Sequence, residues 1–140
     1  MTRDESHWLF RLTPEEWLKA AENERARARA AMVGGERRKG LFEARRAAGM
    51  ACNAFLALSY EERYGRSYMD HLHALGADTT APAGVREAAL RLLEKPPSGE
   101  SVLVALRGLS SPADLVPADA AETIEAYARE LILAAAGPRH

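Results

Sequence analysis

Apolar residues that recur at intervals of three and four positions are the feature that most limits what this chain can fold into. In the stretch from about residue 36 to residue 58 they are Leu41, Ala44, Ala48, Ala51, Phe55 and Leu58. On a helix this spacing forms one apolar stripe, which is stable only when other helices cover it. Gly49 lies among small residues of this helix, where glycine costs about 1 kcal/mol relative to alanine. We therefore expect another part of the chain to pack closely against Gly49.

A clear helix start precedes this stretch. Thr13 can cap the helix, Pro14 suits its first turn, and Glu16 completes a capping box with Thr13. The helix should run to about Val33, because Gly34-Gly35 follows it. Two long helices joined by so short a turn should pack as an antiparallel hairpin.

Three more helices are predicted further along the chain, at about residues 65–75, 84–94 and 118–136. Residues 95–99 contain two prolines and end the second of these helices. Residues 101–106 are either a helical turn or an extended segment that packs on the bundle. No repeat or second domain is visible, and 140 residues suit one domain. We predict a single all-α domain over residues 1–140, an up-and-down bundle of four main helices plus one short helix.

The composition and the cysteine count argue against disulfide-linked, zinc-binding and membrane-spanning proteins. The chain is 47% hydrophobic and 28% charged, and its net charge of -1 exerts no global pull on nucleic acid or membranes. Its single cysteine, Cys52, excludes an internal disulfide and a cysteine-based zinc site, and its alanine-rich surroundings predict a buried, inert thiol. The sequence has no run long enough to span a bilayer, no signal peptide and no phosphate-binding glycine loop. We expect a cytoplasmic protein that neither enters membranes nor uses a cofactor.

The side chains best suited to chemistry gather in residues 64–75. Arg66 and His71 form an R-x4-H pattern there. If Arg66 lies at the frayed start of a helix, its guanidinium can hold a phosphate while His71 exchanges a proton with a ribose hydroxyl or leaving oxygen. Arg66 and His71 are therefore candidate catalytic residues for metal-independent RNA cleavage. The alternative is structural: Arg66 pairs with Asp70, and His71 hydrogen-bonds to Ser67 or to a loop carbonyl.

The histidines of this segment do not predict a metal site. His71 and His73 are two positions apart, so they face different sides of a helix. No carboxylate stands three or four positions from His71 on the same side. We therefore expect no metal ligand here.

The only strongly basic section is residues 19–46. Within it, five cations form a candidate patch for nucleic acid or for a protein partner: Arg37, Arg38, Lys39, Arg45 and Arg46. Such clusters attract phosphate backbones. The alternative is a solvated helical face held by internal ion pairs. The aromatic residues Trp17, Phe42 and Phe55 stand at helical positions and are expected in the core.

In its order of features the chain resembles the HEPN family of small prokaryotic helical bundles. Residues 17–21 (Trp-Leu-Lys-Ala-Ala) are similar to the first helix of that family, and residues 42–56 are similar to its second helix. Residues 70–75 (Asp-His-Leu-His-Ala-Leu) look like the histidine–leucine turn that follows, and residues 118–128 look like the last helix. The resemblance implies a helical bundle of a kind that often dimerises.

The resemblance also implies a range of functions. The family includes metal-independent ribonucleases, toxins paired with nucleotidyltransferase antitoxins, and domains that bind partners without catalysis. Its catalytic R-x4-6-H motif matches Arg66 and His71 here, although this pair lies mid-chain and His73 stands where the toxins have a modified tyrosine. We predict a homodimeric module that binds a protein or RNA partner without catalysis. The alternatives are an endoribonuclease that uses Arg66 and His71, and a structural or regulatory subunit.

Overall fold

The computed structural model describes residues 8–94 and 116–136 of the chain. These residues form five α-helices: α1 (Pro14–Val33), α2 (Arg37–Leu58), α3 (Tyr68–Ala77), α4 (Ala83–Leu93) and α6 (Val116–Ala136). Single turns of 3-10 helix, η1 (Trp8–Arg11) and η2 (Glu62–Tyr64), precede α1 and α3. This part of the chain contains no strand, so the all-α prediction is confirmed. Residues 101–106 lie outside the described residues.

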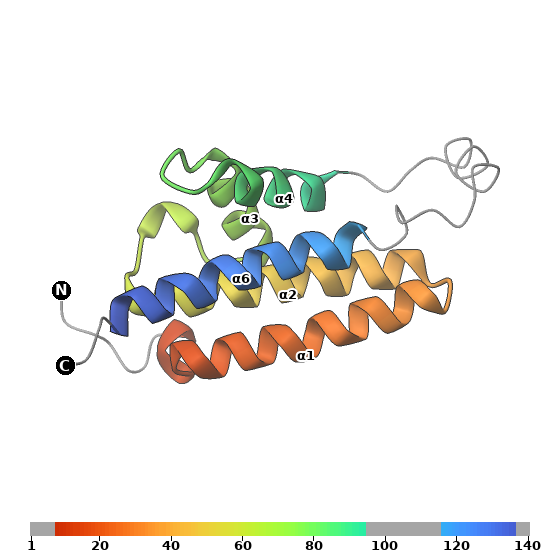
Figure 1. The fold of residues 1–140 in the computed structure, drawn as a ribbon, viewed down its shortest axis with the longest axis horizontal. Coiled ribbons are helices and arrows are strands. Elements are labelled where there is room, and N and C mark those ends of the chain that lie inside the picture. The colour runs from red at the N-terminus through yellow and green to blue at the C-terminus, as the bar shows by residue number, and fades with distance from the viewer. Residues whose placement is uncertain (1–7, 95–115, 137–140) are drawn as a thin grey trace.

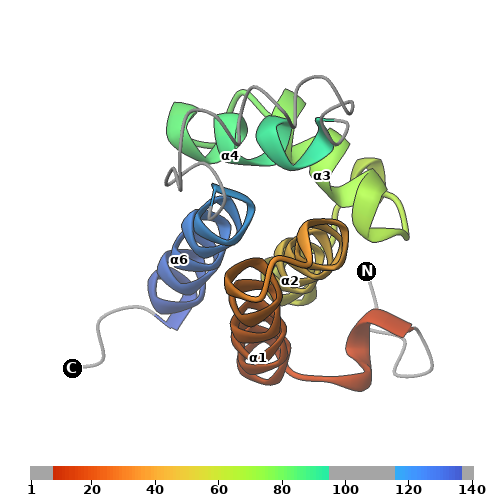
Figure 2. The ribbon, with the colours of Figure 1, turned by 90° about the vertical axis from the view of Figure 1, so that its right-hand side faces the viewer.

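Three long helices form the body of the bundle. As predicted, α1 and α2 pack as an antiparallel hairpin, and α6 lies against both and runs in the same direction as α2 (Figure 1). The shorter helices α3 and α4 pack against each other and cover the side formed by α2 and α6 (Figure 2). The up-and-down topology, in which successive helices alternate in direction along the whole chain, stays a prediction. None of the helices in the described ranges is long and apolar enough to cross a membrane.

The ends of α1 follow the predicted signals. Thr13 Oγ1 accepts a hydrogen bond from the Glu16 backbone N–H at 3.1 Å, and Glu16 Oε1 accepts one from the Thr13 N–H at 2.9 Å. After Val33 the chain turns through Gly35, whose φ of 83° is one that other residues rarely adopt. Because both ends depend on local sequence, the predicted bounds match the observed ones.

The core is built largely from small residues on the buried face of α2. The predicted alanines Ala44, Ala48 and Ala51 are fully buried. Cys52 beside them is also fully buried and free, and burial raises the pKa of its thiol. The prediction of a buried cysteine is therefore confirmed.

The aromatic residues of the hairpin differ in their placement. Phe55 is buried and makes edge-to-face contacts with Tyr64 and Tyr127, with ring centroids 5.6 and 5.7 Å apart. The prediction that Phe42 lies in the core is wrong, because its side chain is 59% exposed and lies under the Arg46 guanidinium. Phe42 is exposed because its neighbour Leu41 belongs to the apolar stripe, and successive side chains on a helix point about 100° apart.

Gly49 allows Tyr68 of α3 to lie directly on the backbone of α2. A Cβ atom added at Gly49 would overlap the Cβ and ring atoms of Tyr68. We expect Gly49→Ala to lower the free energy of unfolding by about 2 kcal/mol, because overpacking outweighs the better helix propensity of alanine. Denaturant unfolding measures the change. Gly84→Ala is the matched control, since a Cβ there meets nothing within 4 Å; equal stability of the two variants would contradict the close packing at Gly49.

Candidate functional site

A glycine and a serine shape the segment before α3. Gly65 ends η2 with a φ of 67°, a left-handed conformation that favours glycine. Ser67 caps α3: its Oγ accepts from the Asp70 N–H at 3.0 Å, and Asp70 Oδ2 accepts from the Ser67 N–H at 3.4 Å. The helix predicted to begin at Gly65 therefore begins at Tyr68. Arg66 stands before the helix rather than within its first turn.

His71 is fully buried near the start of α3. Its Nδ1 lies 2.7 Å from the Tyr64 carbonyl oxygen, and its Nε2 lies 2.7 Å from Oδ1 of Asn53 in α2. Burial lowers the pKa of the imidazole, while the hydrogen bond to the Tyr64 carbonyl and the charge of Asp70 oppose this effect. His71 thus joins η2, α2 and α3, and the alternative in which it bonds a loop carbonyl is confirmed.

Arg66 is exposed and forms no ion pair within residues 8–94 and 116–136, so the expected pairing with Asp70 is not formed. It lines a small hollow together with Asn53 and Tyr68. His71 has no surface open to solvent, so Arg66 and His71 do not converge on one open cleft. Catalysis by this pair stays a prediction, and it requires His71 to become exposed.

The histidines of α3 lie in different environments. His73 is exposed, whereas His71 is enclosed. Within the part of the chain that the structure describes, no three His, Cys, Asp or Glu side chains are grouped so that they could hold a metal ion.

Arg45, one of the five cations of the predicted patch, is used inside the fold. Its Nε donates to the Leu92 carbonyl oxygen at 2.6 Å, and its Nη2 donates to the Glu94 carbonyl oxygen at 2.8 Å. These carbonyls belong to the C-terminal end of α4, where a helix lacks its own donors and favours a cation. Arg45 therefore fastens α4 to α2 and is not available to a ligand.

The other four cations of the patch lie along α2. Arg46 is 3.6 Å from the carboxylate of a buried glutamate in α1, and Lys39 is 3.7 Å from Glu36. Arg37 and Arg38 begin the helix, with Arg37 partly buried and Arg38 exposed. The five predicted residues therefore do not act as one set of exposed charges.

Ion pairs between α1 and α6 engage further arginines of the basic section. Three of these pairs are Arg25–Glu122 at 2.9 Å, Arg29–Asp119 at 3.2 Å and Glu22–Arg129 at 2.7 Å. The alternative of a helical face held by internal ion pairs is confirmed for these residues. Much of the positive charge of residues 19–46 is thus neutralised within the protein.

Glu125 is a buried carboxylate in this interface. Arg25 Nε lies 2.8 Å from Glu125 Oε2, but their orientation does not make a hydrogen bond, and neither oxygen of Glu125 has a donor among the described residues. Burial raises the pKa of Glu125 to about 7, with Glu22 and Glu122 adding to the rise and Arg25 and Arg129 opposing it. The ionised form of Glu125 is therefore disfavoured in the folded protein.

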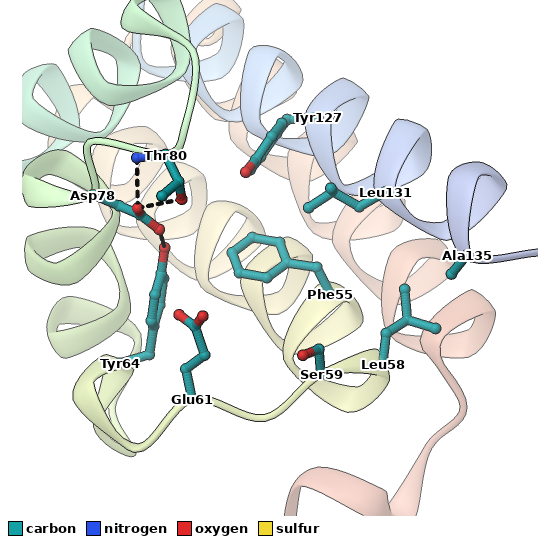
Figure 3. Close-up of a pocket in the computed structure, with 10 residues that line it drawn as sticks. All are labelled: Phe55, Leu58, Ser59, Glu61, Tyr64, Asp78, Thr80, Tyr127, Leu131 and Ala135. Carbon is teal, nitrogen blue, oxygen red and sulfur yellow. Dashed lines mark hydrogen bonds between the residues drawn. The ribbon is translucent and has the colours of Figure 1, made fainter.

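A pocket of about 250 Å³ lies where the C-terminal ends of α2 and α6 meet the loop before α4 (Figure 3). Its lining combines apolar and polar residues: Phe55, Leu58, Tyr127, Leu131 and Ala135 with Ser59, Glu61, Tyr64, Asp78 and Thr80. The Phe55 ring, the Tyr127 hydroxyl and the Glu61 carboxylate point into the same space (Figure 3). Of its two carboxylates Glu61 is exposed and Asp78 is buried, and no basic side chain lines the pocket, so it suits an apolar group beside a positive charge better than a phosphate.

Asp78 fixes one wall of this pocket. Its buried carboxylate accepts hydrogen bonds from the Tyr64 hydroxyl at 2.6 Å, the Thr80 N–H at 2.9 Å and Arg63 Nη2 at 3.1 Å. Burial by itself raises the pKa of Asp78, but the hydrogen bonds from Thr80 and Tyr64 and the charge of Arg63 outweigh it and lower the pKa to about 2. Asp78 is therefore an ionised, fully bonded structural group at neutral pH.

Three buried polar residues of these sites, Asn53, Asp78 and Glu125, are absent from the sequence predictions. A signal existed for Asp78, because an aspartate whose side chain bonds the N–H two residues later is typical of a turn. For Asn53 and Glu125 the only signal is a polar residue near the apolar face of a predicted helix. Their role depends on what the neighbouring helices place beside them.

Comparison with known proteins gives no relative of this chain. No family model matches it, and no curated protein and no solved structure is significantly similar to it. The resemblance to the HEPN family therefore stays a prediction, and a functional assignment has to rest on the geometry of the chain itself.

Proposed function

We propose that this chain is a HEPN-like helical-bundle module that binds a partner protein and has no catalytic activity of its own. The pocket between α2 and α6 carries the proposal, because apolar side chains line it together with the Glu61 carboxylate, which is 45% exposed beside its ion-pair partner Arg63. Energetically important contacts of protein interfaces concentrate where one large side chain fills such a pocket. The complementary partner segment is a large apolar residue next to a lysine or arginine.

A protein partner is favoured over RNA by the placement of positive charge. Arg45 bonds backbone carbonyls, and Arg25 and Arg29 pair with carboxylates of α6. An RNA ligand would need several unpaired cations along one surface. An endoribonuclease would also need the imidazole of His71 within reach of RNA, and that ring is buried.

Selection from a random peptide library on the immobilised protein tests the proposal. We expect the wild type to enrich sequences with a large apolar residue beside lysine or arginine. Ala135→Arg should abolish this enrichment, because Ala135 is exposed and lines the pocket, so a long cation there fills it and repels the ligand. Ala134→Arg is the matched control, since Ala134 is exposed on the same helix and does not line the pocket. Equal enrichment by both variants would contradict the assignment of this pocket.

The catalytic alternative has its own measurement. Incubation of the protein with RNA in the presence of a chelator should leave the RNA intact. Cleavage that disappears in His71→Ala would replace the binding proposal by the endoribonuclease. The homodimer stays a prediction, and light scattering on the full chain measures its mass.

A further inference from the structure

A second hollow lies beside the start of α3 and shares no lining residue with the pocket in Figure 3. Its volume is about 240 Å³, and it is lined by Trp17 of α1, Asn53 of α2 and the successive residues Arg66, Ser67 and Tyr68. Pockets for drug-sized ligands begin at about 300 Å³. A ligand of this hollow is therefore a small molecule.

Asn53 brings an unpaired polar group to the hollow. Its side chain is fully buried, and its Oδ1 faces His71 Nε2 at 2.7 Å. Its Nδ2 has no hydrogen-bond partner among the described residues. Buried amide groups are nearly always bonded at both ends, so the end of the Asn53 amide beside the hollow lacks a partner, which is an acceptor in the orientation with the NH₂ group there.

The charge of His71 decides which end of the Asn53 amide is turned toward the hollow. The Tyr64 carbonyl can only accept, so Nδ1 of His71 carries a hydrogen. When Nε2 also carries one, Asn53 presents its oxygen to the ring and its NH₂ group is left for the hollow. When Nε2 is bare, it accepts from the Asn53 NH₂ group, and the amide oxygen is left instead. The Tyr68 ring, with centroids 6.3 Å apart, and the Asp70 carboxylate also act on the His71 ring.

Arg66 and the aromatic residues define what the hollow can hold. Arg66 is exposed, forms no ion pair with a described residue, and presents a planar fork of donors that matches a carboxylate. Trp17 contributes its ring rather than a donor, because its Nε1 already donates to the Leu9 carbonyl oxygen at 2.8 Å. The lining thus combines a cation and an amide donor with the flat rings of Trp17 and Tyr68.

We propose that this hollow binds a small carboxylate carrying a flat apolar group, held by the Arg66 guanidinium and the Asn53 NH₂ group, and that binding favours the protonated form of His71. The carboxylate oxygens accept from both groups, which gives Asn53 the acceptor that it lacks. Because only the charged ring leaves the Asn53 NH₂ group to the ligand, binding and proton uptake are linked. The site is separate from the partner pocket and does not rest on the proposed function.

Nitrogen NMR of the His71 ring in the full-length protein tests the proposal, with benzoate as the probe and chloride as the control at constant ionic strength. We expect the titration midpoint of His71 to rise by about one pH unit when benzoate reaches about ten times its dissociation constant for the protonated form. Arg66→Gln should remove this rise without unfolding the protein, since Arg66 is exposed. Arg38→Gln, the same change at an exposed residue that does not line the hollow, should retain it.

Three results would overturn the proposal. The first is the same His71 midpoint in benzoate and in chloride. The second is an unchanged benzoate effect in Arg66→Gln. The third is an equal effect of inorganic phosphate, which would exclude a preference for a carboxylate with a flat body. Asn53→Asp adds an independent check, because an aspartate accepts from the charged ring but offers no NH₂ group, so benzoate binding should be lost while His71 stays protonated.

Discussion

Replacement of Asp78 by alanine should lower the free energy of unfolding by about 3 kcal/mol. The carboxylate accepts from the Tyr64 hydroxyl, which is 1% exposed, and from Thr80 and Arg63. Each buried donor that loses its acceptor costs about 1–3 kcal/mol, and here the loss falls on several donors at once. Denaturant unfolding at neutral pH measures the change, which should appear in the midpoint with little change in the m-value.

Asp70→Ala is the control for this experiment. Asp70 is an exposed aspartate whose carboxylate bonds the cap of α3, so its loss should cost about 1 kcal/mol. The pH dependence gives a second signature. Because the folded protein lowers the pKa of Asp78 from 3.8 to about 2, its contribution is complete above about pH 4 and is lost as the pH falls toward 2. If Asp78→Ala costs no more than Asp70→Ala, Asp78 does not hold the pocket wall.

Replacement of Glu125 by glutamine should remove a pH-dependent loss of stability. The folded protein raises the pKa of Glu125 from 4.5 to about 7, so between these values the folded state binds more protons than the unfolded state. Wild-type stability due to this group therefore falls as the pH rises from about 4.5 to about 7, by about 3 kcal/mol in total. Glutamine keeps the shape and does not ionise. The stability of Glu125→Gln relative to wild type should thus increase across this range and then level off.

Denaturant unfolding at a series of pH values measures this difference. Glu130→Gln is the matched control, because it removes a carboxylate from the exposed side of the same helix and changes the net charge equally. If the difference in free energy of unfolding between Glu125→Gln and wild type does not vary with pH, burial does not raise the pKa of Glu125.

The helices themselves could largely be predicted from local sequence. The capping box of Thr13 and Glu16 set the start of α1, and the predicted end of α2 at Leu58 is the observed one. The start of α3 differed because Gly65 adopts a positive φ and Ser67 takes the capping role. Gly65 and Ser67 are local signals for a later helix start, whereas the apolar spacing favours a helix from residue 65 onward. The sequence alone does not show that the later start prevails.

The candidate site was only partly predictable. The sequence marked Arg66 and His71 as a pair, and the structure places one at the surface and the other in the core. A histidine's usefulness for catalysis depends on its access to solvent, which the spacing of residues does not encode. The basic patch shows the same limit, because Arg45 is occupied by carbonyls of a helix about fifty positions away in the chain.

The sequence by itself determined the helices, the hairpin of α1 and α2, and the need for close packing at Gly49, because capping, glycine conformations and apolar spacing act over a few residues. Only the tertiary structure decided that Asn53, His71, Asp78 and Glu125 are buried, and what each of them contacts. Burial and partner placement depend on helices that are distant in sequence, and they set the pKa and the hydrogen bonding of these groups. Residues 64–75 stand out in the sequence because they contain Arg66 and His71. The exposure and hydrogen bonding of these two residues depend on the helices packed around them.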